Sequence, residues 1–220
     1  MLIRQGRNVE LGGERRAALR RYTGGIATVS IEIHPRALHG PWDKGFALDV
    51  HTVSSNYLGD DQYGHARFDT KRSEIGDLLY RLKYRRDQTV LAPIVEAIAG
   101  FLGRSRSSID AMVAVPPSNV RKNQPVMLIV TALSERLKIP VCTECLSKIK
   151  KTPQLKDITE YHERVEALEG AFSVSADHTR GRRLLLFDDL YGSGATVSAI
   201  TGALKEGGAR AVFLLTLTTK

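Results

Sequence analysis

Residues 182–206, R-R-L-L-L-F-D-D-L-Y-G-S-G-A-T-V-S-A-I-T-G-A-L-K-E, constrain the fold more than any other stretch. The apolar run Leu184 to Phe187 predicts a buried strand, which two adjacent carboxylates close, Asp188 and Asp189. A short loop follows from Leu190 to Thr196, and apolar residues then recur at helical spacing, as Val197, Ile200 and Leu204. In open α/β sheets ligands bind beyond the carboxyl ends of the strands, where loop N–H groups and a helix amino terminus attract anions. The order of these features therefore predicts an α/β fold with an anion site.

The two carboxylates narrow the kind of ligand. A site for a bare phosphate gains nothing from two negative charges, whereas sugar hydroxyls donate hydrogen bonds to carboxylates and a hydrated divalent cation is attracted to them. Ser193 and Thr196 add hydroxyl donors to the loop. The combination predicts a site for a phosphorylated ribose; the alternative is an ordinary strand–turn–helix with an acidic turn.

This stretch resembles the motif with which type I phosphoribosyltransferases bind phosphoribosyl pyrophosphate (PRPP). The resemblance implies that the acidic pair holds the ribose 2- and 3-hydroxyls and that the loop holds the 5-phosphate. It also implies that Mg²⁺ arrives with PRPP, with the acidic pair in its outer shell and no direct protein ligand. The PRPP-binding residues are expected to be Asp188, Asp189, Tyr191, Gly192, Ser193, Gly194, Ala195 and Thr196.

A second strand–loop–helix pattern begins with Ala111 to Val115. This predicted strand runs into P-P-S-N-V-R-K-N-Q-P, and apolar residues in helical phase follow from Val126. Because the charges in this loop are positive, it suits a pyrophosphate better than a sugar; the alternative is a plain proline-ended turn. The pyrophosphate is expected to meet Ser118, Asn119, Arg121 and Lys122.

Residues 147–170 are polar, highly charged and poor in apolar side chains. Inside a compact domain such a segment is either disordered or a lid. A lid over a phosphate site excludes water from a reactive cation. On that interpretation Lys151 and Arg164 are the catalytic candidates, and Lys150 is a further cation for the leaving pyrophosphate.

Residues 1–72 are expected to form a β-rich region in front of a phosphoribosyltransferase-like domain at 73–220. Ile26 to Ile33 and Phe46 to Val53 have strand patterns, and the region is either a small module or an elaborated edge of the main sheet. Its histidines match no zinc spacing, so no metal site is expected there. They are His34, His39, His51 and His65.

Two amphipathic helices are expected at residues 73–86 and 88–102, the first with Ser73 as its N-cap. Basic side chains gather at the carboxyl end of the first helix, where they complement the helix dipole; the alternative is a patch that faces an anion. They are Arg81, Lys83, Arg85 and Arg86. The last strand is expected at Ala211 to Leu217.

The two cysteines form a lone C-x-x-C, Cys142 and Cys145. A redox or metal role is the alternative for this pair, but zinc would need two further ligands. Two buried thiols are therefore expected, the first in a short strand at Pro140 to Cys142. Few cysteines, no signal-peptide core and no apolar run near ~20 residues indicate a cytoplasmic protein without a membrane span. The net charge of +8 leaves nucleic acid open as a partner, and a homodimer is also open.

A longer series of motifs covers residues 74–220, beginning with L-L-Y-R-L-K-Y-R at 78–85. Next come V-P-P-S at 115–118, N-Q at 123–124, T-P-Q at 152–154, E-R at 163–164, G-A-F at 170–172 and D-D-L-Y-G-S-G-A-T. This order resembles the ComF family of phosphoribosyltransferase-like proteins, which is linked in bacteria to DNA uptake, or competence. Members usually begin with a four-cysteine zinc ribbon; residues 1–70 hold no cysteine, so zinc is not expected.

The expected architecture is therefore α/β, a type I phosphoribosyltransferase fold with a parallel sheet flanked by helices. The expected function is transfer of the phosphoribosyl group of PRPP to a nitrogen nucleophile with release of pyrophosphate, the acceptor base being undefined by the sequence. The competing hypothesis is a non-catalytic protein that senses PRPP or a nucleotide, or an accessory to DNA uptake or processing. It is favoured by departures from the family: Ala167 replaces a lid asparagine, and Gly192-Ser193 replaces a threonine pair.

Overall fold

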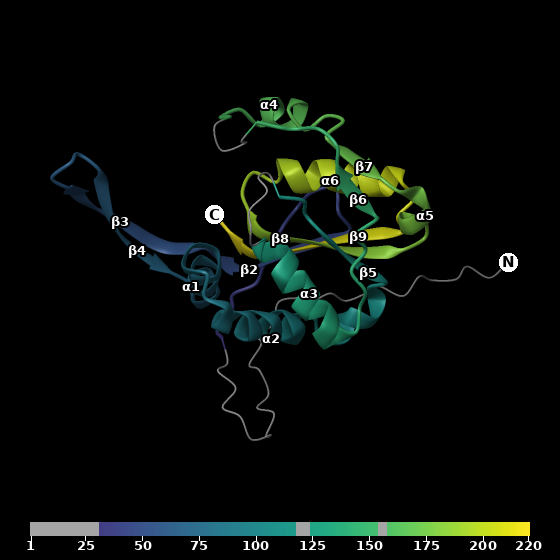
Figure 1. Ribbon diagram of the computed structural model, residues 1–220, viewed down its shortest axis with the longest axis horizontal. Helices are drawn as coiled ribbons and strands as arrows, with labels where there is room; N and C mark the ends of the chain where they lie inside the picture. The colour runs from purple at the N-terminus through teal and green to yellow at the C-terminus, as the bar shows by residue number, and fades with distance from the viewer. Residues whose placement is uncertain (1–30, 118–123, 154–157) are drawn as a thin grey trace, which may run out of the picture.

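The structure is a computed structural model that describes residues 31–117, 124–153 and 158–220. Its centre is a five-stranded sheet in the order β1-β2-β9-β8-β5 (Figure 1). From β2 to β5 the neighbouring strands are parallel, and β1 at the edge is antiparallel. The strands are β1 (Arg36–Ala37), β2 (Lys44–Val50), β5 (Ala111–Ala114), β8 (Arg183–Tyr191) and β9 (Ala211–Thr219).

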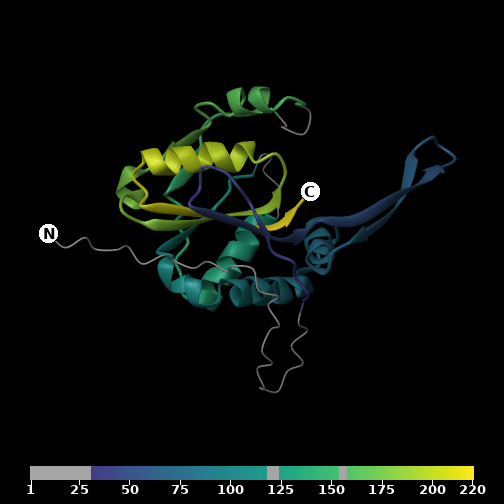
Figure 2. The same cartoon turned by 180° about the vertical axis from the view of Figure 1, so that it is seen from behind.

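Helices cover both faces of this sheet. α6 (Ala195–Glu206) lies over one face, whereas α1 (Glu74–Tyr80), α2 (Leu91–Leu102) and α3 (Pro125–Leu137) lie over the other (Figures 1 and 2). The Leu184 to Phe187 part of β8 is apolar without interruption because its side chains alternate between two buried faces. Leu184 and Leu186 belong to the cluster under α6, and Leu185 and Phe187 to the cluster under the other helices. The predicted α/β fold, a mostly parallel sheet between helices, is confirmed.

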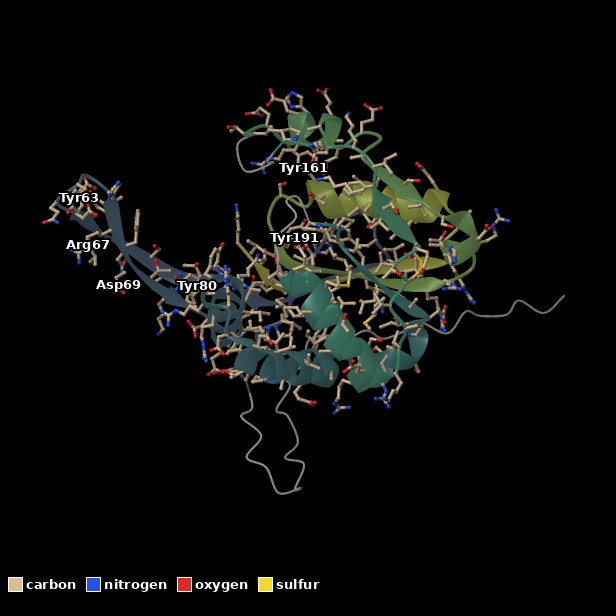
Figure 3. All side chains as sticks on the ribbon, in the orientation of Figure 1. Tyr63, Arg67, Asp69, Tyr80, Tyr161 and Tyr191 are labelled. Atoms are coloured by element: carbon tan, nitrogen blue, oxygen red, sulfur yellow. A yellow bond between two sulfur atoms is a disulfide. The ribbon has the colours of Figure 1, made fainter. Side chains whose placement is uncertain are left out.

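Residues 31–72 contribute to two different sheets. β2 lies inside the main sheet, parallel to β9, whereas β3 (Thr52–Asp60) and β4 (Ala66–Arg72) form a separate antiparallel ribbon. This ribbon, called the arm below, projects away from the sheet in both views (Figures 1 and 2). Tyr63 lies near its far end and Tyr80, on α1, near its base (Figure 3). The domain boundary at residue 72 coincides with the end of β4 and stays a prediction.

The strands expected in this region need correction. The single strand predicted at Phe46 to Val53 is two strands, because the chain leaves the main sheet after Val50 and enters the arm at Thr52. Of the strand predicted at Ile26 to Ile33, residues 26–30 lie outside the described part of the chain, and residues 31–33 are not in a strand. β9 continues beyond the predicted end at Leu217 to Thr219, because it pairs with β8 as far as that residue.

The first predicted helix begins as expected and ends early. Ser73 Oγ accepts a hydrogen bond from Gly76 N (3.0 Å) and donates one to Val50 O (2.5 Å), so the N-cap also ties α1 to the end of β2. After Tyr80 the helix changes into a π-helical turn, η1 (Arg81–Arg85). The second predicted helix is a 3₁₀ turn, η2 (Gln88–Val90), followed by α2 and by the 3₁₀ turn η3 (Gly103–Ser108).

The segment predicted as a lid leaves the body through β6 (Leu146–Lys148) and returns through β7 (Phe172–Val174), which pair antiparallel. The chain between these two strands contains α4 (Tyr161–Glu166), which lies above α6 (Figure 1). Helix α5 (Ala176–Thr179) follows β7. The described parts of the segment therefore form a cover over α6. No helix in the described ranges has the length and apolar character needed to cross a bilayer.

The prediction of two buried thiols is wrong, because Cys142 and Cys145 form a disulfide. The chain bends at Thr143 to Cys145 and brings the two Cα atoms to 5.4 Å, a separation that a disulfide bridges. The strand predicted at Pro140 to Cys142 is reduced to one parallel bridge between Met112 and Val141.

Replacing Gly76 by alanine should lower the free energy of unfolding by about 1–3 kcal/mol. A Cβ at Gly76 would lie 2.4 Å from His51 O, so α1 would be pushed away from the end of β2. Urea denaturation measures the effect. Gly202→Ala in α6 is the matched control; its Cβ would meet nothing within 4 Å, and it should stabilise the protein by about 0.5–1 kcal/mol. Equal stabilities for the two variants would contradict the close packing of α1.

Candidate functional site

The acidic pair lies inside strand β8 rather than after it. The sequence predicted a strand that ends at Phe187, yet β8 continues to Tyr191, because its pairing with β9 runs on through Asp188 opposite Thr216 and Tyr191 opposite Thr219. The connection to α6 is therefore only Gly192 to Gly194. Since β2, β9, β8 and β5 are parallel, their carboxyl ends meet at one edge, and the acidic pair occupies the middle of it.

The loop and the start of α6 line a hollow of about 230 Å³. α6 begins at Ala195 without a side-chain cap, so its amino-terminal N–H groups and positive dipole end are available to an anion. The hollow is bounded by cations from two other parts of the chain, Arg164 of α4 and Lys220 after β9. The predicted PRPP-binding residues that line it are Asp188, Tyr191, Gly192, Ser193, Gly194, Ala195 and Thr196.

Tyr191 and Gly194 shape this loop together. Gly194 has φ +80°, and a Cβ there would lie 2.5 Å from the Tyr191 hydroxyl, so conformation and space both require glycine. On its other side the Tyr191 ring meets Trp42 edge-on, with 6.1 Å between ring centroids. Burial raises the pKa of Tyr191, and the neighbouring Tyr161 of α4 adds to the effect (Figure 3).

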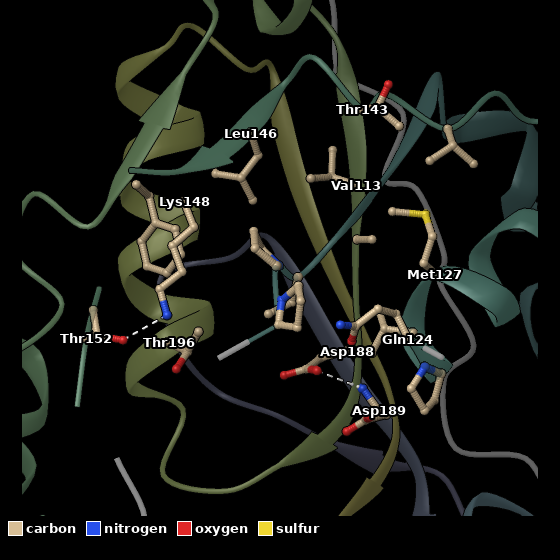
Figure 4. A pocket seen from close by; sticks show the side chains of 18 of the residues that line it. Val113, Gln124, Met127, Thr143, Leu146, Lys148, Thr152, Asp188, Asp189 and Thr196 are labelled. Carbon is tan, nitrogen blue, oxygen red and sulfur yellow. Dashed lines mark hydrogen bonds between the residues drawn. The ribbon is translucent and has the colours of Figure 1, made fainter. Parts of the chain in front are cut away.

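A larger cavity of about 510 Å³ is also lined by the acidic pair (Figure 4). It shares Asp188 and Thr196 with the smaller hollow, and Asp189 also lines it. Its further polar lining includes Lys83, Tyr84, Gln124, Thr143, Lys148 and Thr152. Its apolar lining includes Val113, Val115, Met127, Val141, Leu146 and Phe172. Asp188 and Thr196 thus lie where a small hollow with two cations in its lining adjoins a larger, mostly apolar cavity.

The predicted pyrophosphate residues Ser118, Asn119, Arg121 and Lys122 lie outside the described part of the chain. Their flanking residues Pro117 and Gln124 both line the larger cavity.

The lid residues have different positions. Arg164 lines the smaller hollow, where its Nε donates to Ile158 O (2.7 Å). Lys151 is exposed and lines neither cavity described here, and Lys150 Nζ lies 3.4 Å from Glu169 O. Of the lysines in this segment, Lys148 at the end of β6 lines the larger cavity (Figure 4). Its Nζ donates to Thr152 Oγ1 (2.8 Å), and burial lowers its pKa.

The two carboxylates have different electrostatic environments. Burial raises the pKa of Asp188 to about 7, and the charge of Asp189 adds to this shift. Asp188 Oδ1 accepts a hydrogen bond from Asp189 N (2.8 Å), which partly offsets the cost of its negative charge. Asp189 Oδ1 lies 2.8 Å from Lys83 Nζ. An acid that titrates near neutral pH at the edge of a cavity is a typical functional-site feature.

Lys83 is a candidate site residue whose position differs from the one that the sequence predicted. We expected it to complement the dipole of its helix, together with its basic neighbours. Arg81 instead pairs with Asp87 (2.6 Å), and Lys83 reaches across to Asp189. The cluster of basic residues in the sequence was the only indication that a cation lies near the acidic pair. The apolar spacing of the helix does not predict the π-helical turn that directs Lys83 toward β8.

The histidines have local partners rather than a shared ligand. His34 Nδ1 lies 3.0 Å from Asp49 Oδ2, and His65 Nδ1 lies 3.3 Å from Asp61 Oδ2. Burial lowers the pKa of His51, which lies beside the acidic pair, and the charges of Arg72 and Lys83 lower it further. Across the residues that the structure describes, no three His, Cys, Asp or Glu side chains are grouped as metal ligands.

Comparison with known proteins finds similar solved structures but no similar sequence. No protein-family model and no curated protein sequence matches the chain. Adenine phosphoribosyltransferase from Saccharomyces cerevisiae, solved with an imino-altritol bisphosphate and adenine, is 13% identical over 75% of this chain and 85% of that one, with a TM-score of 0.43. Orotate phosphoribosyltransferase from Aeropyrum pernix is 15% identical over 72% and 73%, with a TM-score of 0.42. Adenine phosphoribosyltransferase from Thermoanaerobacter pseudethanolicus is 16% identical over 76% and 95%, with a TM-score of 0.41.

Replacing Asp188 by asparagine should stabilise the ligand-free protein, and more so at pH 8 than at pH 5. The raised pKa means that the folded state keeps a proton that the unfolded chain releases, so the wild type loses stability as the pH rises from about 4 to about 7. Asparagine does not titrate, and the gain at pH 8 should be on the order of 1–3 kcal/mol. Urea denaturation at both pH values checks this; an equal difference at the two values would contradict the buried, titrating carboxyl.

Replacing Gly194 by alanine should destabilise the protein by about 1–2 kcal/mol, because an L-residue is strained at this positive φ. The Cβ would also displace the Tyr191 ring from Trp42, the single tryptophan of the chain. Thermal unfolding measures the first effect and Trp42 fluorescence the second. Gly192→Ala is the control, since its Cβ would meet nothing within 4 Å. Identical fluorescence in all three proteins would show that the loop tolerates the change.

Proposed function

We propose that the protein binds PRPP and transfers its phosphoribosyl group to a nitrogen nucleophile, with release of pyrophosphate. The observation that carries this proposal is that two adjacent cavities share Asp188 and Thr196 in their linings, and that Asp189 also lines the larger one. A sugar bound over the pair would extend its 5-phosphate into the smaller hollow. Its C1 substituent would extend into the larger cavity.

The residues support separate roles in binding. Asp188 and Asp189 accept hydrogen bonds from the ribose 2- and 3-hydroxyls. The N–H groups from Gly192 to Thr196 hold the 5-phosphate, with Ser193 and Thr196 as hydroxyl donors and Arg164 as a cation from the lid. The pyrophosphate contacts of Ser118, Asn119, Arg121 and Lys122 stay a prediction, as does a catalytic role for Lys151. Lys148 is the described lysine best placed for the leaving group.

The reaction breaks the bond between C1 and the pyrophosphate oxygen and forms a bond between C1 and nitrogen. Pyrophosphate leaves with the bonding electron pair, and the positive charge at C1 peaks in an oxocarbenium-like transition state. The carboxylates below the sugar stabilise that charge, and the segment around α4 limits access of water. The donor set fits Mg²⁺ through its water molecules; when bound with PRPP, the ion neutralises pyrophosphate charge.

A non-catalytic PRPP or nucleotide sensor is the second candidate. Ala167, at the end of α4, offers no side-chain polar group in a lid where the resembled family carries asparagine. A sensor needs the hollow and the acidic pair but not turnover, so binding and catalysis must be measured separately.

The test is calorimetric titration with PRPP and Mg²⁺, followed by pyrophosphate release in the presence of a panel of nucleobases. The double variant Asp188→Asn/Asp189→Asn should bind PRPP at least about 100-fold more weakly, because it loses charge-assisted hydrogen bonds to two hydroxyls. Asp60→Asn/Asp61→Asn, an adjacent pair on the arm, removes the same charge and should leave the affinity unchanged. Unchanged affinity in the first variant would refute the ribose assignment.

The remaining outcomes separate the candidates. Binding with pyrophosphate release identifies a transferase, and binding without release supports the sensor. DNA binding that weakens with salt and survives the loss of both aspartates would favour a DNA-handling accessory role instead.

A further inference from the structure

Lys83 is held against the acidic pair by its own backbone geometry. It lies in the π-helical turn η1, between the buried Leu82 and the exposed Tyr84. Its Nζ is 2.8 Å from Asp189 Oδ1, and the two side chains are only 18% and 14% exposed. At this exposure solvent screens the attraction little, so the contact is stronger than a surface ion pair. Single π turns occur frequently at functional sites.

The other cations of this turn do not share that role. Arg81 pairs with Asp87 at 2.6 Å, and the guanidinium of Arg85 lies over the Tyr80 ring, 5.7 Å from its centroid. Lys83, in contrast, lines the larger cavity together with Asp188 and Asp189. A ligand that enters this cavity and reaches the acidic pair therefore meets the ammonium group of Lys83 as well.

The positive charge changes what the pair can bind. Two ionised carboxylates without a counter-charge carry −2 and attract a divalent cation, which takes carboxylate oxygens directly. With Lys83 in place the net charge of the three groups is one unit more positive, and one Asp189 oxygen is already engaged. The remaining oxygens still accept hydrogen bonds, which is all that sugar hydroxyls need. The groups facing this cluster from other strands are His51 after β2 and Thr218 of β9, whose Oγ1 donates to Asp189 O (3.3 Å).

We propose that Lys83 is a specificity-determining residue, which neutralises Asp189 so that the acidic pair receives the two hydroxyls of a sugar and does not take a divalent cation directly. This inference rests on the proposed function for the identity of the sugar, but not for the exclusion of the cation. The inference also implies that the divalent cation binds to the phosphates of the ligand, because the charge of Asp189 is already neutralised by Lys83.

The experiment is calorimetric titration at pH 8 with Mn²⁺ alone and with ribose 5-phosphate alone. Lys83→Met keeps most of the aliphatic stem and removes the charge. We expect this variant to bind Mn²⁺ at least about tenfold more tightly than the wild type, because the charge at the pair becomes one unit more negative. Lys83→Arg keeps the charge and should behave as the wild type. Lys71→Met, on the exposed arm, removes the same charge elsewhere and should also behave as the wild type.

The outcomes are distinguishable. If folded Lys83→Met, checked by circular dichroism, binds Mn²⁺ no more tightly than the wild type, Lys83 is only a tie between η1 and β8 and the inference is overturned. If Lys71→Met gains Mn²⁺ affinity equally, the effect is one of net charge and the inference is also overturned. If the wild type fails to bind ribose 5-phosphate while the Mn²⁺ difference appears, the proposed function fails and the role of Lys83 at the acidic pair stands.

Discussion

The hydrogen-bonded pairing of β8 with β9 does not stop where the apolar core stops. It continues past Phe187 through the acidic pair to Tyr191, so the two carboxylates are carried by a strand and not by a loop. Thr218 reinforces this edge with a hydrogen bond from its hydroxyl to Asp189 O. Because the acids are fixed in this way, the connection to α6 needs only three residues, and both cavities take their position from the same backbone ladder.

Fixing the acids at this edge has an electrostatic cost. Asp188 loses hydration and lies beside a second carboxylate, and its raised pKa reports both effects. Different interactions offset this cost for the two carboxylates. Asp188 accepts a hydrogen bond from the N–H of Asp189, whereas Asp189 forms an ion pair with Lys83 of η1. Such an arrangement is less stable than an apolar one would be, and this is typical of sites arranged for a ligand rather than for stability.

Local patterns carried most of what the sequence predicted correctly. The run from Leu184 to Leu204 gives strand, acids, loop and helix in one stretch, and Ser73 caps α1 with its own neighbours. The errors lie where distant segments decide. The end of β8 depends on β9, the division after Val50 depends on the arm, and the orientation of Lys83 depends on Asp189. The C-x-x-C spacing predicted buried thiols, whereas the disulfide depends on the bend at Thr143 to Cys145.

Strand β2 has a consequence for how the protein folds during its synthesis. It is made early, yet its parallel partner β9 is made last among the described strands; Asp43 accepts a hydrogen bond from Val212 N across 169 positions of the chain. During synthesis on the ribosome, the apolar side chains of β2 stay unpaired until β9 has been made. Contacts of such long range slow folding and expose unpaired strand edges to aggregation. The candidate ligand-binding edge therefore closes only after β9 has been made.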